Sequence, residues 1–378
     1  MEANERVEDE EEKQELWSWG AGTDGQLGTG KLQDEHVPQL LPVLLSLSLL
    51  SCGGAHVIAL THGKKVLTWG RGTSGQLGHG DLVNSLEPKS VEVLNNFNIT
   101  HASAGWNHSG FVSGLFSLVK NSVPFLVILD TLFEFDFVYL LVECGYLFTC
   151  GDGSFGQLGH GDYVSQSSPV KVSHLASRHV CEIACGMRHS LALLKGEHGD
   201  QVYGFGSGKR GQLGISKEKV KSVSLPQCVS GLQEVDVSSI SANGDHSAAL
   251  SSDAHLYTWG RGFGGTPDVC CPNRVISHYS FKQAALGWNH ALLLTDEGDI
   301  LMLGGSHHGV LSNPQKEISV NRMYHLDSAN EDLDKGQVKE IPGLDRIKVA
   351  GVASGSEHSV ITTGKHFGWQ NGRVLRVG

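Results

Sequence analysis

A ten-residue glycine-rich motif recurs along the chain and constrains its fold more than any other feature. Its clearest copy reads Trp-Gly-Arg-Gly-Thr-Ser-Gly-Gln-Leu-Gly and contains Gly70, Gly72, Gly75 and Gly78. Three further copies are nearly intact and two are degraded; they begin at Trp19, Cys150, Phe205, Trp259 and Leu303. A motif that returns at such intervals indicates a repeat architecture before it indicates any chemistry.

A second motif, Gly-x-x-His followed by a strand-like apolar run, alternates with the first. The glycines and histidines of its regular copies are Gly53 and His56, Gly105 and His108, Gly186 and His189, Gly287 and His290, and Gly355 and His358. One more copy has Asn243 in place of the glycine before His246. Short β-rich runs and glycine-rich turns, repeating at about fifty residues, predict a β-propeller with four strands per blade.

The paired motifs resemble those of the regulator of chromosome condensation repeat family, over roughly residues 16–363. The resemblance implies an all-β fold, a seven-bladed propeller whose N-terminal strand closes the ring. No Gly-Gln-Leu-Gly follows His358, so we expect the last blade to be incomplete and the C-terminus after about residue 363 to be aberrant.

Length and charge indicate one domain with a short leader. Residues 1–15 hold eight acids and two bases, which predicts a disordered acidic leader, and residues 16–378 form the propeller domain. The net charge of −11 and the lack of a basic run argue against direct nucleic-acid binding. The eight scattered cysteines suggest reduced thiols, and no signal peptide opens the chain, so we expect a cytoplasmic or nuclear protein without a membrane anchor.

Residues 113–141 interrupt the rhythm with about 29 surplus residues, rich in phenylalanine and leucine. Three interpretations remain open. A membrane-spanning helix is disfavoured because charges and a proline interrupt the segment. A genuine loop insertion costs little entropy, but it would expose many apolar side chains. Translated intron sequence is the interpretation we favour, because removal of the segment restores the repeat.

The motifs supply no catalytic group, cofactor site or metal site. Gly-x-Gly-x-x-Gly can mark a dinucleotide site, but here no helix-forming sequence follows it, so we interpret the glycines as turn residues. One histidine per blade spreads these side chains around the ring, and we expect each to bond backbone groups in its own or the next blade.

Three residues beside the motif histidines are candidates for contact with a partner: Trp106, Arg188 and Trp288. A plant ultraviolet-B receptor of this family uses stacked tryptophan and arginine in consecutive blades. In this chain the tryptophans belong to the second and fifth units and the arginine to neither, which disfavours photoreception.

The sequence therefore predicts a non-enzymatic propeller scaffold for protein–protein interaction. The alternative, implied by the family resemblance, is guanine-nucleotide exchange on a small GTPase, and the second alternative is ultraviolet-B signalling. The sequence does not predict an oligomeric state.

Overall fold

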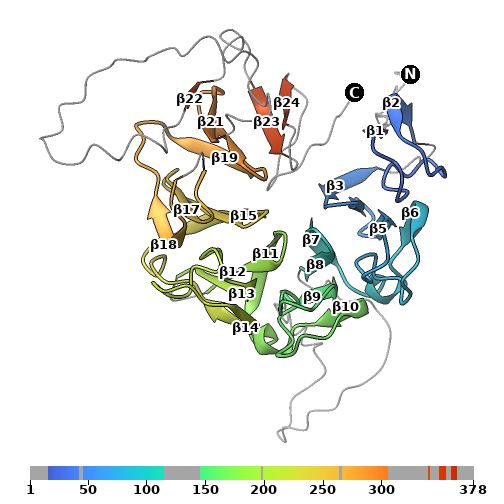
Figure 1. The fold of residues 1–378 in the computed structure, drawn as a ribbon, viewed down its shortest axis with the longest axis horizontal. Helices are drawn as coiled ribbons and strands as arrows, with labels where there is room; N and C mark the ends of the chain where they lie inside the picture. Colours follow the sequence, from blue (N-terminus) through green and yellow to red (C-terminus); the bar gives the residue numbers. More distant parts are fainter. Residues whose placement is uncertain are drawn as a thin grey trace, which may run out of the picture.

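The computed structural model describes residues 16–41, 46–114, 145–196, 199–263, 266–304, 339–340, 349–354 and 359–363. The regular elements of these residues are almost all β-strands, and their sheets stand like blades around a common centre (Figure 1). The other elements are two single-turn 3-10 helices, η1 (Glu92–Leu94) and η2 (Ser173–Leu175). No helix in this part of the chain has the length and apolar composition that crossing a bilayer requires.

Five antiparallel sheets have four strands each, and we number them first to fifth blade in chain order. The first blade is β3 (Leu47–Cys52), β4 (His56–Thr61), β5 (Val66–Gly70) and β6 (Ser85–Ser90). The second is β7 (Ile99–Ala104), β8 (His108–Ser113), β9 (Leu147–Gly151) and β10 (Gln166–Lys171). The third is β11 (His179–Cys185), β12 (His189–Lys195), β13 (Gln201–Ser207) and β14 (Ser222–Cys228).

The fourth blade is β15 (Val237–Asn243), β16 (His246–Ser251), β17 (Leu256–Gly260) and β18 (Val269–Arg274). The fifth is β19 (Phe281–Leu286), β20 (His290–Thr295), β21 (Ile300–Gly304) and β22 (Lys339–Glu340). Two sheets have two strands: β1 (Trp17–Gly20) with β2 (Glu35–Leu40), and β23 (Val349–Ser354) with β24 (Ser359–Thr363).

The expected seven-bladed propeller is wrong, because the described residues form five four-stranded blades. The N-terminal strand does not close a ring either: among the described strands β1 pairs with β2 alone, and β24 with β23 alone. The reason lies in the order of the motifs. Each blade needs a Gly-x-x-His hairpin followed by a Trp-Gly-type strand, but the first Trp-Gly has no hairpin before it and the last hairpin has no Trp-Gly after it.

The hydrophobic core lies between neighbouring blades rather than inside one sheet. Leu49 and Ile58 of the first blade pack in one cluster with Phe111 and Cys150 of the second. All six residues of β4, β8 and β16 are buried, because these strands have neighbours on both faces of their sheet. The first strand of each blade lies nearest the centre (Figure 1), and residues of β3, β7, β11, β15 and β19 line a central channel.

The segment predicted as an insertion begins and ends at adjacent positions of one hairpin. The Ser113 amide donates to the Tyr146 carbonyl at 2.9 Å. In the first blade the same bond joins Thr61 to Lys65 at 3.0 Å, across a turn of three residues. The second blade is thus complete without the intervening sequence. Residues 115–141, the acidic leader, Gly355, His358 and the chain after residue 363 lie outside the described residues.

Candidate interaction face and central channel

The turns that carry both motifs lie together on one face of the blades. In each of four blades, the residue after the Trp-Gly-type dipeptide donates its amide to the carbonyl of the residue before the motif histidine. These bonds are Arg71 to Ala55 (2.8 Å), Asp152 to Asn107 (2.8 Å), Ser207 to Arg188 (2.7 Å) and Arg261 to Asp245 (2.9 Å). We call the surface formed by these turns the motif face.

The glycines of the ten-residue motif allow the tight turns of this face. Gly70, Gly75 and Gly78 have positive φ angles of 101°, 83° and 75°, which side chains other than glycine rarely adopt. A Cβ on Gly72 would lie 2.0 Å from the Val83 carbonyl oxygen. The glycines therefore serve backbone geometry, and in the described turns the chain continues through bends into the fourth strand without forming a helix.

Three motif histidines join adjacent blades through a repeated relay of two hydrogen bonds. The Nε2 of His56, His108 and His189 lies 2.9 Å from the hydroxyl of Ser109, Ser190 and Ser247 respectively, each on the next blade. Each serine in turn donates to a glutamine carbonyl of the preceding blade: Gln76 (2.7 Å), Gln157 (2.9 Å) and Gln212 (2.7 Å). Because the serine hydroxyl donates its only proton to the carbonyl, it can only accept from the histidine, and each histidine therefore donates from Nε2.

Burial keeps these imidazoles neutral. It lowers the pKa of His56 and His189 to about 3, with neighbouring charges adding to the effect, and that of His108 to about 4. The Nδ1 atoms pack against the motif glycines, where a Cβ on Gly53 would approach His56 Nδ1 to 2.9 Å. A buried imidazole that stays neutral and donates from Nε2 to the next blade serves to join the blades. It is poorly suited to proton transfer, because its pKa lies far below neutral pH.

His246 breaks this pattern because the next blade has Ala291 where the others have serine. Its Nε2 lies 2.7 Å from the Trp288 carbonyl and its Nδ1 lies 2.6 Å from the Arg261 carbonyl. Burial lowers the pKa of His246, while the two carbonyl acceptors act in the opposite direction. The ring also stacks on Phe263 with centroids 4.2 Å apart. The joint between the fourth and fifth blades therefore differs from the three before it.

The motif glutamines hold the turns, and one of them also bonds the next blade. Each glutamine Oε1 accepts from the backbone two residues earlier, as Gln76 does from Ser74 at 2.9 Å. Gln212 Nε2 donates across the joint to Asp245 at 3.0 Å. Sequence reasoning did not assign this role to the glutamines, although their presence in four copies of the motif was the available signal.

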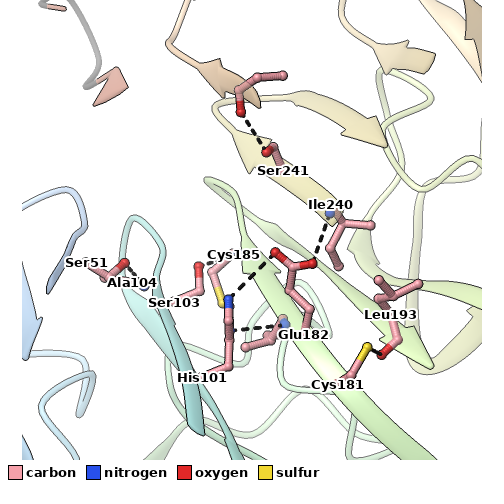
Figure 2. Close-up of polar contacts among 12 residues, drawn as sticks. Ser51, His101, Ser103, Ala104, Cys181, Glu182, Cys185, Leu193, Ile240 and Ser241 are labelled. Carbon is pink, nitrogen blue, oxygen red and sulfur yellow. Dashed lines mark hydrogen bonds and ion pairs between the residues drawn. The ribbon is translucent and has the colours of Figure 1, made fainter. Parts of the chain in front are cut away.

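A cavity of about 270 Å³ occupies the channel between the innermost strands. Its wall is held by side-chain bonds to the backbone of the next blade (Figure 2). Ser51 accepts from the Ala104 amide and Ser103 from the Cys185 amide, both at 3.0 Å. These two serine hydroxyls of the channel wall thus hold one blade against the next.

The channel also contains a buried ionisable pair that sequence reasoning missed. His101 Nε2 lies 3.7 Å from Glu182 Oε1, and the other carboxylate oxygen accepts from the Ile240 amide at 3.2 Å (Figure 2). The two residues occupy the same register position of successive blades, where the other four-stranded blades have Leu49, Ser239 and Gln283, so no pattern in the sequence marked them. Among the described residues no group of three or more His, Cys, Asp or Glu side chains could hold a metal ion.

Two of the three predicted partner-facing residues meet at the centre of the motif face. Trp106 and Trp288 form an edge-to-face pair with ring centroids 5.4 Å apart, although they come from the second and fifth blades. Both are half-buried. Arg188 is exposed and does not join them; its guanidinium lies 4.8 Å from the centre of the Phe155 ring.

Comparison with family models identifies the repeat. The model described as "Regulator of chromosome condensation (RCC1) repeat" matches residues 14–60, 65–112, 144–193 and 200–250, and a second model of the same description matches residues 237–265. These matches cover more than half of the chain. The chain belongs to the regulator of chromosome condensation repeat family.

Curated relatives differ widely in length and name. The chain is 28% identical to the ultraviolet-B receptor UVR8 of Arabidopsis thaliana over 85% of this chain and 71% of the receptor. It is 29% identical to the E3 ubiquitin-protein ligase HERC2 of Mus musculus over 92% of this chain, which is 6% of that ligase. It is also 28% identical to the secretion-regulating guanine nucleotide exchange factor of Mus musculus, over 83% of this chain and 64% of that protein.

Solved structures share the fold at low sequence identity. Yeast RCC1 (Prp20), bound to Kap60, aligns with a TM-score of 0.67 at 22% identity, covering 93% of this chain and 77% of that chain. Prp20p from Saccharomyces cerevisiae, in a structure whose description includes binding to Gsp1p and histones, aligns with a TM-score of 0.54 at 21% identity over 93% of this chain and 92% of that one. These similarities establish the propeller fold.

Proposed function

We propose that this protein is a non-enzymatic scaffold that binds a protein partner on the motif face. The observation that carries the proposal is that each repeat contains two kinds of position, repeated and variable. The repeated histidines of the motifs are buried in the joints, whereas the residues beside them differ from blade to blade and lie on the motif face, as Trp106, Arg188 and Asn289 do. A rigid frame with variable turns is a common basis for recognition.

The chemistry of the described residues supports binding rather than catalysis. The buried histidines of the joints are neutral and already donate to serine. Relatives of this family carry names as different as a photoreceptor, a ubiquitin ligase and an exchange factor. A propeller fold that is shared by the family and binds different partners in different members is consistent with these different names.

Affinity purification from the source tissue tests the proposal. We expect the wild-type chain to recover a specific partner that is lost with the double variant Arg188→Glu and Asn289→Arg, whose positions are both exposed on the motif face. The matched control is Lys65→Glu, an exposed turn position on the opposite face. Recovery of the same partners by all three proteins would refute binding through this face.

Guanine-nucleotide exchange is the second candidate, favoured by the similarity to the secretion-regulating exchange factor. Release of a fluorescent guanine nucleotide from a panel of small GTPases tests it directly. Acceleration by the wild-type chain, reduced in the double variant, would favour exchange over a purely structural scaffold. Size-exclusion chromatography before and after ultraviolet-B exposure tests the remaining alternative, which requires a dimer that dissociates.

A further inference from the structure

The third blade carries a concentration of positive charge on the motif face that the first, second and fourth blades do not share. Its two motif turns, residues 186–189 and 207–221, contain six basic residues and one acid. The corresponding turns of the first blade have one of each, and those of the second have two acids and no base. Those of the fourth blade, residues 243–246 and 260–268, have two acids and one base. The chain as a whole has a net charge of −11, so the positive charge of the third-blade turns stands apart from the rest of the sequence.

Structural contacts account for only part of this charge. Arg210 and Lys219 both approach Asp268 of the fourth blade, at 3.3 and 2.6 Å, and so help to join two blades. Arg188 lies over an aromatic ring. The remaining basic residues are Lys209, Lys217 and Lys221, which are exposed and form no ion pair with another described residue.

Exposed apolar side chains lie beside the end of this turn, next to Lys221. Tyr163 is 51% exposed, and its hydroxyl lies 3.5 Å from the Ser222 hydroxyl at the start of β14. Leu225, on the same strand, is 42% exposed. The turn before β10 contacts β14, because the Gly161 amide donates to the Ser224 carbonyl at 2.9 Å. The surface therefore combines positive charge with a small apolar area, and we call Lys209, Lys217, Lys221, Tyr163 and Leu225 the basic patch.

We propose that the basic patch binds an acidic segment of a protein partner, whose carboxylates contact the three lysines and whose apolar side chain contacts Tyr163. This inference rests on the proposed function and names the chemistry of its partner. Tyrosine is enriched at interfaces between proteins, and charge complementarity selects the partner and speeds its approach.

Neighbouring charges favour a protein segment over a nucleic acid. Asp152 and Asp162 lie in the turns of the second blade and Asp245 in those of the fourth, so that the positive surface is one blade wide. A phosphate backbone leaving the patch in either direction would meet carboxylates. A short peptide segment can keep its charges within one blade and turn its neutral residues outward.

Fluorescence polarisation with the full chain tests the proposal. The probe is a labelled twelve-residue peptide of glutamate and leucine, and its control replaces every glutamate with glutamine. We expect the acidic probe to bind and to weaken at least tenfold between 50 and 300 mM salt, because exposed charges are screened. The triple variant Lys209→Glu, Lys217→Glu and Lys221→Glu should bind at least tenfold more weakly, or about 1.4 kcal/mol.

A matched triple variant controls for total charge. Lys31→Glu, Lys65→Glu and Lys282→Glu make the same change in net charge at exposed positions elsewhere, and binding should stay within twofold of wild type. Equal weakening in both triples, equal binding of the neutral peptide, or no binding at all would overturn the proposal. Tighter binding of a single-stranded oligonucleotide, lost in the first triple, would overturn it in favour of a nucleic-acid surface.

The outcome separates this inference from the proposed function. If the partner recovered from tissue is lost with the Arg188 and Asn289 double variant but retained by the lysine triple, the scaffold function stands and the basic patch is not its site. If no tissue partner is recovered, the scaffold function fails, whereas the peptide measurement uses purified components only.

Discussion

Removal of one hydroxyl from a joint between blades tests the relay most directly. Ser190 is fully buried, accepts from His108 and donates to the Gln157 carbonyl. Ser190→Ala would leave one buried N–H and one buried carbonyl without a partner. Each such group costs about 1–3 kcal/mol, so we expect a loss of about 3 kcal/mol in the free energy of unfolding.

The chain itself shows how the loss could be reduced. Where Ala291 replaces the serine, His246 bonds the carbonyl of Trp288. The equivalent carbonyl for His108 is that of Met187. If His108 turned to it, only the Gln157 carbonyl would stay unpaired, and the loss would fall to about 1.5 kcal/mol.

Urea unfolding followed by circular dichroism measures the total loss, and amide hydrogen exchange in β8 and β12 measures the local one. Because the unfolding entropy grows with chain length, 3 kcal/mol corresponds to a decrease of only about 4 °C in Tm, so the urea experiment is the sharper. The control is Ser154→Ala, an exposed serine on the same face. A loss no larger than that of the control would refute the stabilising role of the relay.

Three further predictions concern pH, the excess segment and one glycine. The three relay histidines have pKa values lowered from 6.5 to about 3–4. Below pH 6.5 the unfolded chain therefore binds protons that the buried rings do not bind. The free energy of unfolding should be highest above pH 6.5 and should fall as pH falls toward 4, by up to about 1.4 kcal/mol per pH unit for each histidine. Acid titration of urea midpoints should show this loss, and a flat profile would contradict it. Joining Ser113 to Tyr146 through the three residues 62–64 of the first blade should leave the circular dichroism spectrum unchanged and Tm within about 3 °C; an unfolded product would show that the segment is needed for folding. Gly72→Ala places a Cβ 2.0 Å from a backbone carbonyl and should cost about 2–4 kcal/mol in urea unfolding, whereas Gly63→Ala, whose Cβ has no neighbour closer than 3.6 Å, should cost under about 1 kcal/mol.

The sequence was sufficient to predict the fold class because the repeated residues are those that form the turns between strands. Glycine positions and strand-like runs predicted four-stranded blades, and the structure has them. The number of blades was wrong because it came from the family resemblance and not from the motif order of this chain. The six copies of each motif, beginning with a Trp-Gly strand and ending with a hairpin, already contained the correction.

Contacts across the ring were beyond sequence reasoning. Trp106 and Trp288 are far apart in the chain and in blade number, yet their rings meet because both hairpins end at the channel mouth. The pairing of His101 with Glu182 likewise depends on how adjacent blades are rotated about the centre. Such relations need coordinates, since a motif describes one blade and not its orientation to the next.

The relay has a direction, and this makes the array of blades unequal. Each histidine depends on a hydroxyl supplied by the blade that follows it, and that hydroxyl depends on a carbonyl of the blade before it. Loss of the C-terminal neighbour would therefore leave a buried N–H without a partner, whereas loss of the N-terminal neighbour would leave a buried hydroxyl. At Ala291 the hydroxyl is missing, and His246 bonds the Trp288 carbonyl of the fifth blade instead. Three consecutive relays thus join the blades from β3 to β18, whereas the next joint is held by a different set of bonds, including Ser241 to the Ala284 carbonyl and Asn243 to the Leu286 carbonyl.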